Sequence, residues 1–183
     1  MNKGDHFDIQ QPGGAVRIRE PQAGDGPRIW HLIEATGALD SNSLYCNLLQ
    51  CSHFAATCAL AEMDDQLVGW MSGYVPPARP DTLFVWQVCV TDAARGQGVA
   101  SRLISSVLKR PGCRDVRHVE CTITTENAAS WALFRKVACE LEADLISHPH
   151  FLRETHLDGR HDREHRVTIG PFEASGLRQA KAA

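Results

Sequence analysis

The segment that most constrains this chain is residues 84–110, FVWQVCVTDAARGQGVASRLISSVLKR, where an apolar run leads through two glycines into a helix pattern. Residues 84–90 are β-branched, aromatic or apolar with little interruption, which predicts a central strand covered on both faces. Apolar residues then recur at steps of three and four, at positions 99, 103, 104, 107 and 108. This spacing predicts an amphipathic helix with one face on a sheet, ended by Pro111-Gly112.

The loop between that strand and helix predicts an anion site. Gly96 and Gly98 let backbone amides approach a ligand closely, because no Cβ is in the way. The first amides of a helix are unpaired and lie at the positive end of the helix dipole. Such a site most often holds phosphate.

Two well-known phosphate loops fit this segment poorly. A nucleotide-triphosphate loop needs a lysine that is absent here. A dinucleotide loop needs a third glycine where this chain has Ser101, and its acid about 20 residues on would be Glu120. Glu120 falls inside the next strand pattern rather than at its end, so the dinucleotide reading is the weaker alternative. A plain glycine turn that only joins strand to helix stays open.

A third loop type fits better, on residues Arg95, Gly96, Gln97, Gly98, Val99 and Ala100. They resemble the signature of the Gcn5-related N-acetyltransferases, in which these amides hold the pyrophosphate of acetyl-coenzyme A. Downstream, residues 116–124 predict a strand, and Asn127 is a good N-cap for the following helix. The spacing Asn127-x-x-Ser130-x-x-Leu133-Phe134 resembles the second half of the same signature. The resemblance implies that Asn127, Ser130 and Phe134 line the pantetheine arm, and that Val88 and Val90 pair with it.

The remaining patterns complete the acetyltransferase order of elements. Strands are expected at 16–20, 56–63, 66–75, 139–146 and 165–171, with Asp64-Asp65 turning the hairpin. Helices are expected at 25–39 and, capped by Asp40 or Ser41, through 49. The expected fold is α/β (α+β), a mixed sheet of about seven strands flanked by helices. One domain is expected at 15–172, with a flexible N-terminus at 1–14 and a flexible tail at 173–183.

Composition excludes several classes of function. The formal net charge is −3 and no basic stripe is present, which argues against nucleic acid as a partner. No signal-peptide core and no run of membrane-spanning length is visible, so a cytoplasmic protein without a membrane partner is expected. The 7 cysteines form no C-x-x-C pair and are expected to be reduced. Histidines crowd residues 148–165, but their spacing matches no zinc pattern, so no metal is expected.

The acceptor is indicated by segments 36–62 and 156–167, which are crowded with polar groups. They resemble one branch of the family, whose members acetylate the 4-amino group of the diamino acid L-2,4-diaminobutyrate in ectoine biosynthesis. The resemblance also implies a homodimer. An acceptor with two ammonium groups and one carboxylate needs a partner for each charge. The candidate acceptor residues are Asp40, Asn42, Ser43, Tyr45, Trp86 and Gln87, with Glu164 as a second carboxylate. Asp40 as a helix cap, and Tyr45 and Trp86 as core residues, remain the structural alternatives.

The amine attacks a thioester only when neutral, so a base is expected. Glu164 and His161 are the candidate catalytic residues, and a backbone N–H near Val88 is the expected oxyanion donor. Many family members have a tyrosine, as general acid, where this chain has Phe134, so no acid is assigned. Acetylation of another amine, such as a polyamine, an aminoglycoside or a peptide N-terminus, stays open, as does a non-catalytic binder of acetyl-coenzyme A.

Overall fold

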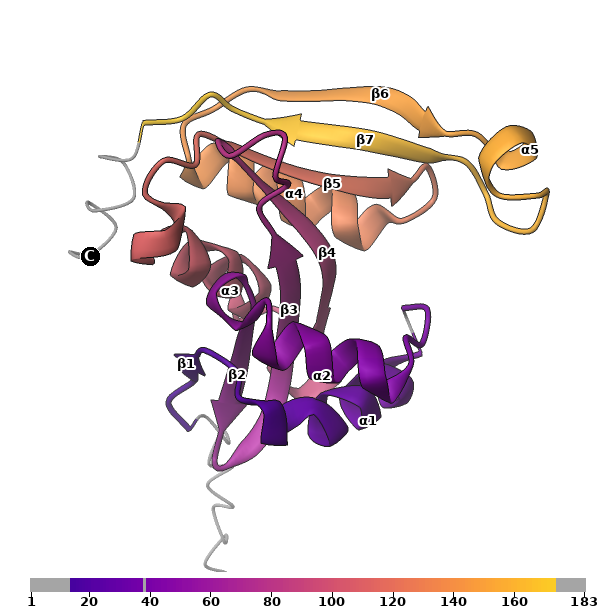
Figure 1. The fold of residues 1–183 in the computed structure, drawn as a ribbon. Helices are drawn as coiled ribbons and strands as arrows, with labels where there is room; N and C mark the ends of the chain where they lie inside the picture. Colours follow the sequence, from indigo (N-terminus) through magenta and orange to yellow (C-terminus); the bar gives the residue numbers. More distant parts are fainter. Residues whose placement is uncertain (1–13, 38, 174–183) are drawn as a thin grey trace, which may run out of the picture.

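The computed structural model describes residues 14–37 and 39–173, so most of the expected terminal segments lies outside the described residues. The chain forms a seven-stranded sheet in the order β1-β2-β3-β4-β5-β7-β6, and Figure 1 shows how the strands are arranged. The strands are β1 (Arg17–Arg19), β2 (Ala59–Met63), β3 (Gln66–Tyr74), β4 (Thr82–Val90), β5 (His118–Thr124), β6 (Leu145–Phe151) and β7 (Glu164–Ile169). The helices are α1 (Gly26–Thr36), α2 (Leu44–Ser52), α3 (Val99–Leu108), α4 (Ala128–Glu140) and α5 (Arg153–His156). Short 3-10 turns occupy Ala23–Asp25, Ala55–Thr57, Asp92–Ala94 and Pro111–Cys113. The mixed sheet of the expected fold is confirmed.

Helices cover the two faces of this sheet in pairs. The larger core lies on the α3/α4 face, where buried residues of α3 and α4, such as Leu103 and Val137, join those of β4 and β5. The smaller core lies on the α1/α2 face, where Ile33 and Cys51 pack with Trp70 and Cys89. In Figure 1, α1 and α2 cross in front of β3 and β4. A ligand that reaches both faces must therefore pass through the sheet.

Among the described strands, β4 and β5 form a parallel pair whose ladder is short. β4 and β5 pair over three residues, from Thr82↔His118 to Phe84↔Glu120, and every other neighbouring pair is antiparallel. Beyond Phe84 the two strands diverge, and Figure 1 shows β5, β7 and β6 crossing the picture in a different direction from β2–β4. We call the gap between Val85–Val90 and the end of β5 the β4–β5 wedge.

Several local predictions are confirmed. Asp64 and Asp65 form the hairpin turn, both with positive φ (50° and 60°), which short polar side chains tolerate best after glycine. Asn127 caps α4 by accepting a hydrogen bond from the Ser130 backbone N–H at 3.0 Å. β4 is central in the strand order, although the Trp86 side chain is 47% exposed, so the expected cover on both faces is incomplete.

Other local predictions are wrong. Neither Asp40 nor Ser41 caps α2; the cap is Ser43, whose Oγ accepts from the Cys46 backbone N–H at 3.1 Å. The sixth strand does not lie at 139–146, because α4 continues to Glu140 and left-handed Glu142 (φ 52°) turns the chain before β6. Pro111-Gly112 does not end α3; the helix already ends at Leu108, and Pro111 opens a 3-10 turn.

The cysteines and the helix lengths bear on the class of protein. All seven cysteines are free thiols, five of them buried, while Cys46 is half-buried and Cys139 is exposed. Among the described helices, none is both long and apolar enough to cross a membrane.

Candidate active site

The β4 edge of the wedge presents backbone groups that the sheet leaves unpaired. The Thr91 backbone N–H donates to the Val68 carbonyl at 2.9 Å, so Thr91 faces β3. Backbone direction alternates along a strand, and the register with β3 is regular from Gln87 to Val90. Val88 and Val90 therefore point their N–H and C=O groups away from β3, into the wedge, where the described residues supply no strand to pair with them. The unpaired groups of Val88 and Val90 match the hydrogen-bonding pattern of an extended chain with amide groups.

One residue of β4 bulges at the same place. Trp86 has no partner in β3, because Ser72 pairs with Gln87 and Gly73 pairs with Val85. Such bulges bend a strand and re-aim its side chains, and they are frequent beside active sites. The bulge therefore coincides with the start of the unpaired edge.

The loop after β4 has the geometry of an anion site. Gly96 and Gly98 both lie in the left-handed region, with φ of 76° and 71°. Gly98 is the N-cap of α3 and brings no side-chain hydrogen bond to it, so the first amides of the helix stay open. The Gln97 side chain donates to the Ala93 carbonyl at 3.0 Å, and Arg95 pairs with Asp92 at 2.6 Å. These two contacts fix the loop, Val99 anchors it in the core, and the half-buried Ala100 follows in the first turn of α3.

A cation that the sequence reasoning missed lies over this loop. The Lys136 ammonium on α4 is 3.2 Å from the position that a Cβ would take at Gly98. Glu140 holds the same ammonium at 3.6 Å and also accepts from Ser101 Oγ at 3.3 Å. Its distance of 38 residues from Gly98 in the sequence hid this contact, since only the packing of α4 on α3 brings them together.

The residues expected to line the pantetheine arm split into two groups. Asn127 and Ser130 lie at the start of α4, where the cap bond occupies the Asn127 carbonyl oxygen. Phe134 is 4% exposed and belongs to the core of the α3/α4 face. Its ring therefore packs in the core beneath the start of α4, and a phenyl ring has no proton to donate.

On the opposite face, three of the candidate acceptor residues meet. Asn42 Nδ2 donates to Gln87 Oε1 at 2.9 Å, and Gln87 Nε2 donates to the Asp40 carbonyl at 2.9 Å. Gln87 projects to the α1/α2 face, as does Cys89 two residues later. Asp40 itself is exposed, beside this cluster.

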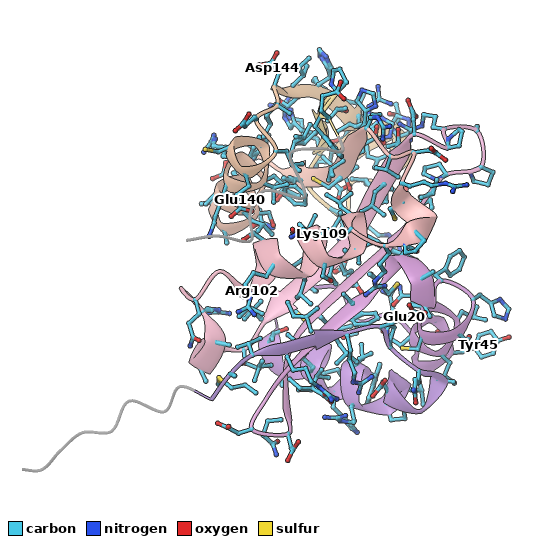
Figure 2. All side chains as sticks on the ribbon, turned by 90° about the vertical axis from the view of Figure 1, so that its left-hand side faces the viewer. Glu20, Tyr45, Arg102, Lys109, Glu140 and Asp144 are labelled. Carbon is cyan, nitrogen blue, oxygen red and sulfur yellow. The ribbon has the colours of Figure 1, made fainter. Side chains whose placement is uncertain are left out.

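The other candidate acceptor residues are placed less tightly. Ser43 serves as the cap of α2, and Trp86 is half-exposed on the bulge. Tyr45 is 68% exposed and projects from the edge of the molecule in Figure 2, so it is not a core residue.

The candidate base Glu164 starts β7, opposite Thr124 of β5 and Phe151 of β6. Its neighbour His165 contacts Trp131 of α4, so alternation turns Glu164 to the α1/α2 face. Asp40, Gln87 and Glu164 thus share one face of the sheet. His161 is exposed in the loop before β7. No group of three or more potential metal ligands occurs within the described ranges.

Thiols near the site are held in their protonated form. Burial raises the pKa of Cys89 to about 11, two residues from Gln87. Because the thiolate is the nucleophile, a thiol of this kind is poorly suited to carry an acyl group. This favours direct transfer between two bound substrates.

The structure has two cavities of notable size among the described residues. One, of about 520 Å³, lies between the end of β5 and α5, lined by Thr125, Glu126, Leu152, Arg153, Glu154, Thr155, Asp162 and Arg163. The other, of about 660 Å³, runs between α3 and α4 from Ser101 to Lys109. Figure 2 shows Arg102 and Lys109 on one side of it and Glu140 on the other. The second cavity begins at Ser101, just after the residues of the anion loop.

Comparison with known proteins agrees with this geometry. The model of the acetyltransferase (GNAT) family matches residues 28–138. The L-2,4-diaminobutyric acid acetyltransferase of Methylotuvimicrobium alcaliphilum is 46% identical over 159 residues, which cover 87% of this chain and 92% of that protein. The protein of the same name from Chromohalobacter salexigens is 48% identical, covering 85% of this chain and 81% of its own.

A solved structure is similar over nearly its whole length. It is the diaminobutyrate acetyltransferase of Paenibacillus lautus, in complex with L-2,4-diaminobutyric acid and coenzyme A. The TM-score is 0.83 at 39% sequence identity, and the match covers 88% of this chain and 98% of that one.

Proposed function

The chain belongs to the acetyltransferase (GNAT) family, and we propose that it transfers acetyl from acetyl-coenzyme A to the 4-amino group of L-2,4-diaminobutyrate. The product is N4-acetyl-L-2,4-diaminobutyrate. The observation that carries the proposal is the similarity to the Paenibacillus enzyme, whose structure holds both the diamino acid and coenzyme A. The wedge, the anion loop and the polar cluster on the α1/α2 face give this chain a place for each part of those two ligands.

Acetyl-coenzyme A binds from the α3/α4 face. Its pyrophosphate rests on the amides of residues 95–100 at the start of α3, where the helix dipole favours negative charge. Lys136 adds a positive charge above Gly98. The pantetheine arm pairs with Val88 and Val90 and passes Asn127 and Ser130, which brings the thioester to the bulge of β4.

The diamino acid binds from the α1/α2 face. Asp40 and Glu164 supply negative charge for its two ammonium groups, and Trp86 walls the pocket and faces a cation. Because the sheet separates the two substrates everywhere except at the wedge, the amine meets the thioester only there.

The reaction is a direct attack of the neutral amine on the thioester carbonyl. Glu164, directly or with His161, takes the proton that the 4-ammonium group must lose. The Val88 N–H stabilises the oxyanion of the tetrahedral intermediate. Phe134 gives no proton to the departing sulfur, and a thiol with a pKa of about 8.5 leaves tolerably well as the thiolate.

In the cell, the proposal places this protein in the cytoplasm, in ectoine biosynthesis, as a homodimer with one acetyltransferase domain at 15–172. The exposed residues of β6 offer a surface for the dimer contact.

The test is release of free thiol from acetyl-coenzyme A with L-2,4-diaminobutyrate, ornithine, lysine, spermidine or a short peptide as acceptor. Fast release with diaminobutyrate alone is the expected result, and the position of the acetyl group in the product is read by NMR. Release only with another amine would discard the acceptor assignment. No release with any amine, together with tight binding of acetyl-coenzyme A, would favour a non-catalytic binder.

A further inference from the structure

Both hydrogen-bonding groups of the Gln87 side chain are bonded to the protein itself. It is 6% exposed, and both ends of its amide are bonded to the Asp40 loop, which we define as residues 39–43. Its NH₂ group donates to the Asp40 carbonyl, and its carbonyl accepts from the Asn42 amide, both at 2.9 Å.

The chemistry of the two contacts fixes the orientation of this amide. A backbone carbonyl only accepts, so the NH₂ group of Gln87 must face Asp40. The oxygen of Gln87 is then left to face the NH₂ group of Asn42. Flipping the amide would oppose two acceptors on one side and two donors on the other, so the pair of bonds holds one arrangement.

We call the two hydrogen bonds between Gln87 and the Asp40 loop the clasp. The residues around Gln87 indicate that the clasp serves a purpose other than stability. The next residue inward on the same face is Cys89, packed with Trp70 and Leu60 in an apolar core. Directly opposite Gln87 on β3 lies Ser72, which is fully buried and whose hydroxyl has no hydrogen-bond partner in the described chain. The Gln87 amide on this apolar face is a departure from apolar packing, and such departures concentrate at functional sites.

The position of Gln87 in the strand indicates the function of the clasp. Gln87 lies between the bulge at Trp86 and Val88, whose N–H points into the wedge. The Gln87 side chain thus bonds the Asp40 loop to β4. The neighbouring residue, Val88, directs its N–H to the proposed site of the thioester. A substrate binds more tightly when the groups that hold it are already fixed in place before it arrives.

We infer that Gln87 is a positioning residue, which together with Asn42 holds the Asp40 loop in place over the β4–β5 wedge and so sets the affinity for the diamino acid without contacting it. The inference rests on the proposed function and refines it, since Asn42 and Gln87 then belong to the scaffold of the acceptor site. Asp40 remains the group that meets the substrate.

Three variants and one control test this. Gln87→Leu keeps the size of the side chain and removes both bonds, Gln87→Glu opposes the Asp40 carbonyl with a carboxylate, and Asn42→Ala removes one bond. Ser72→Ala is the matched control, because its hydroxyl lies at the same depth and makes no bond to lose. Steady-state kinetics are measured with both substrates varied, and acetyl-coenzyme A affinity is measured by calorimetry.

The loss of two neutral hydrogen bonds predicts a rise of roughly tenfold in KM for the diamino acid in Gln87→Leu, and roughly a third to half of that effect in Asn42→Ala on a logarithmic scale. The expected kcat and the affinity for acetyl-coenzyme A stay within about twofold of wild type, because the lost interaction acts equally in ground and transition states. A double variant, Gln87→Leu with Asn42→Ala, is expected to match Gln87→Leu alone, because Gln87→Leu already removes the hydrogen bond from Asn42. Ser72→Ala keeps wild-type constants.

Two outcomes would overturn the inference. A wild-type KM in both Gln87→Leu and Gln87→Glu would show that the clasp has no effect on the acceptor. A large fall in kcat in Gln87→Leu, with Asn42→Ala at wild-type values, would make Gln87 a direct substrate contact. If Gln87→Leu does not fold, Gln87→Glu and Asn42→Ala carry the same comparison.

A second measurement, which needs no substrate, tests the clasp independently of the proposed function. Amide hydrogen exchange of residues 39–43 is expected to speed up in Gln87→Leu and Asn42→Ala but not in Ser72→Ala. Should the wild-type protein acetylate a different amine, the same variants are assayed with that amine. Unchanged exchange in the loop would contradict the clasp itself, whatever the acceptor.

Discussion

Replacing Gly98 by aspartate, with asparagine as its neutral counterpart, tests the anion loop most directly. The two substitutions have nearly equal volume, and both residue types tolerate the left-handed backbone that Gly98 adopts at φ 71°. A Cβ at this position would lie 3.2 Å from the Lys136 ammonium, the flexible end of a half-exposed side chain that shifts easily. Both variants are therefore expected to fold.

The difference between them is one charge at the start of α3. A carboxylate at position 98 would lie roughly 6 Å from a phosphate bound on the first amides of the helix. At an effective dielectric constant of about 20, two unit charges at that distance repel by about 3 kcal/mol, which weakens binding about a hundredfold. Gly98→Asn carries only the backbone cost of about 1 kcal/mol, which lowers stability, so its affinity is expected to stay within a fewfold of wild type.

Calorimetric titration with acetyl-coenzyme A measures both variants, and thermal unfolding confirms that both are folded. The gap between aspartate and asparagine is expected to shrink at 1 M salt, where the screening length falls to about 3 Å. Equal dissociation constants for the two variants at low salt would refute the assignment, and Gly98 would then be only a turn.

Three further substitutions and one control probe other parts of the molecule. Lys136→Ala is expected to weaken acetyl-coenzyme A binding about three- to tenfold and to flatten the salt dependence of binding. Lys109→Ala, at the far end of α3, is the control and should change the affinity and its salt dependence less. Equal effects of the two variants would place the phosphate elsewhere. Glu164→Ala should cut kcat by about a hundredfold or more at unchanged affinity for acetyl-coenzyme A, and a parallel loss of both would remove Glu164 as the base. The hydrogen bond from Arg19 lowers the pKa of Glu62 to about 2, below its ordinary value of 4.5. A carboxyl with a lowered pKa contributes stability above its unfolded value that is lost as pH falls, so urea midpoints should drop between pH 4.5 and about 2. Glu62→Gln should lower the midpoint at pH 7 and reduce that drop, and an unchanged pH dependence would count against the pair.

The order of elements was predictable because each carries a local signal. The Gly96 and Gly98 loop, the spacing of apolar residues in α3 and the Asn127 cap are read within a few residues, and the structure confirms the strand, loop and helix order. The sixth strand was misplaced because 139–146 is apolar and acidic in a way that fits a strand or a helix end. In the structure the segment is a helix end, because Glu142 has a positive φ and turns the chain there. The local sequence pattern does not predict a positive φ at a glutamate.

The candidate site was less predictable because its contacts join distant segments. Asp40 before a helix looked like a cap, but Ser43 takes that role and the Asp40 carbonyl is bonded to β4 instead. Gln87 was predicted as a substrate contact from the family resemblance, whereas its side chain is bonded to residues 40 and 42 of the protein itself. Lys136 carried no signal at all, since an exposed lysine in a helix is ordinary until the packing of α4 on α3 brings it to Gly98.

The short β4–β5 ladder has a consequence for how turnover is controlled. In the proposed complex, the open edge at Val88 and Val90 grips the pantetheine amides, which are the same before and after acetyl transfer. Spent coenzyme A therefore fills the gap between the two half-sheets nearly as well as the loaded form does. Catalysis by this chain then responds to the ratio of acetylated to free coenzyme rather than to the acetylated form alone, and carbon is committed to the acetylated diamino acid only when that ratio is high.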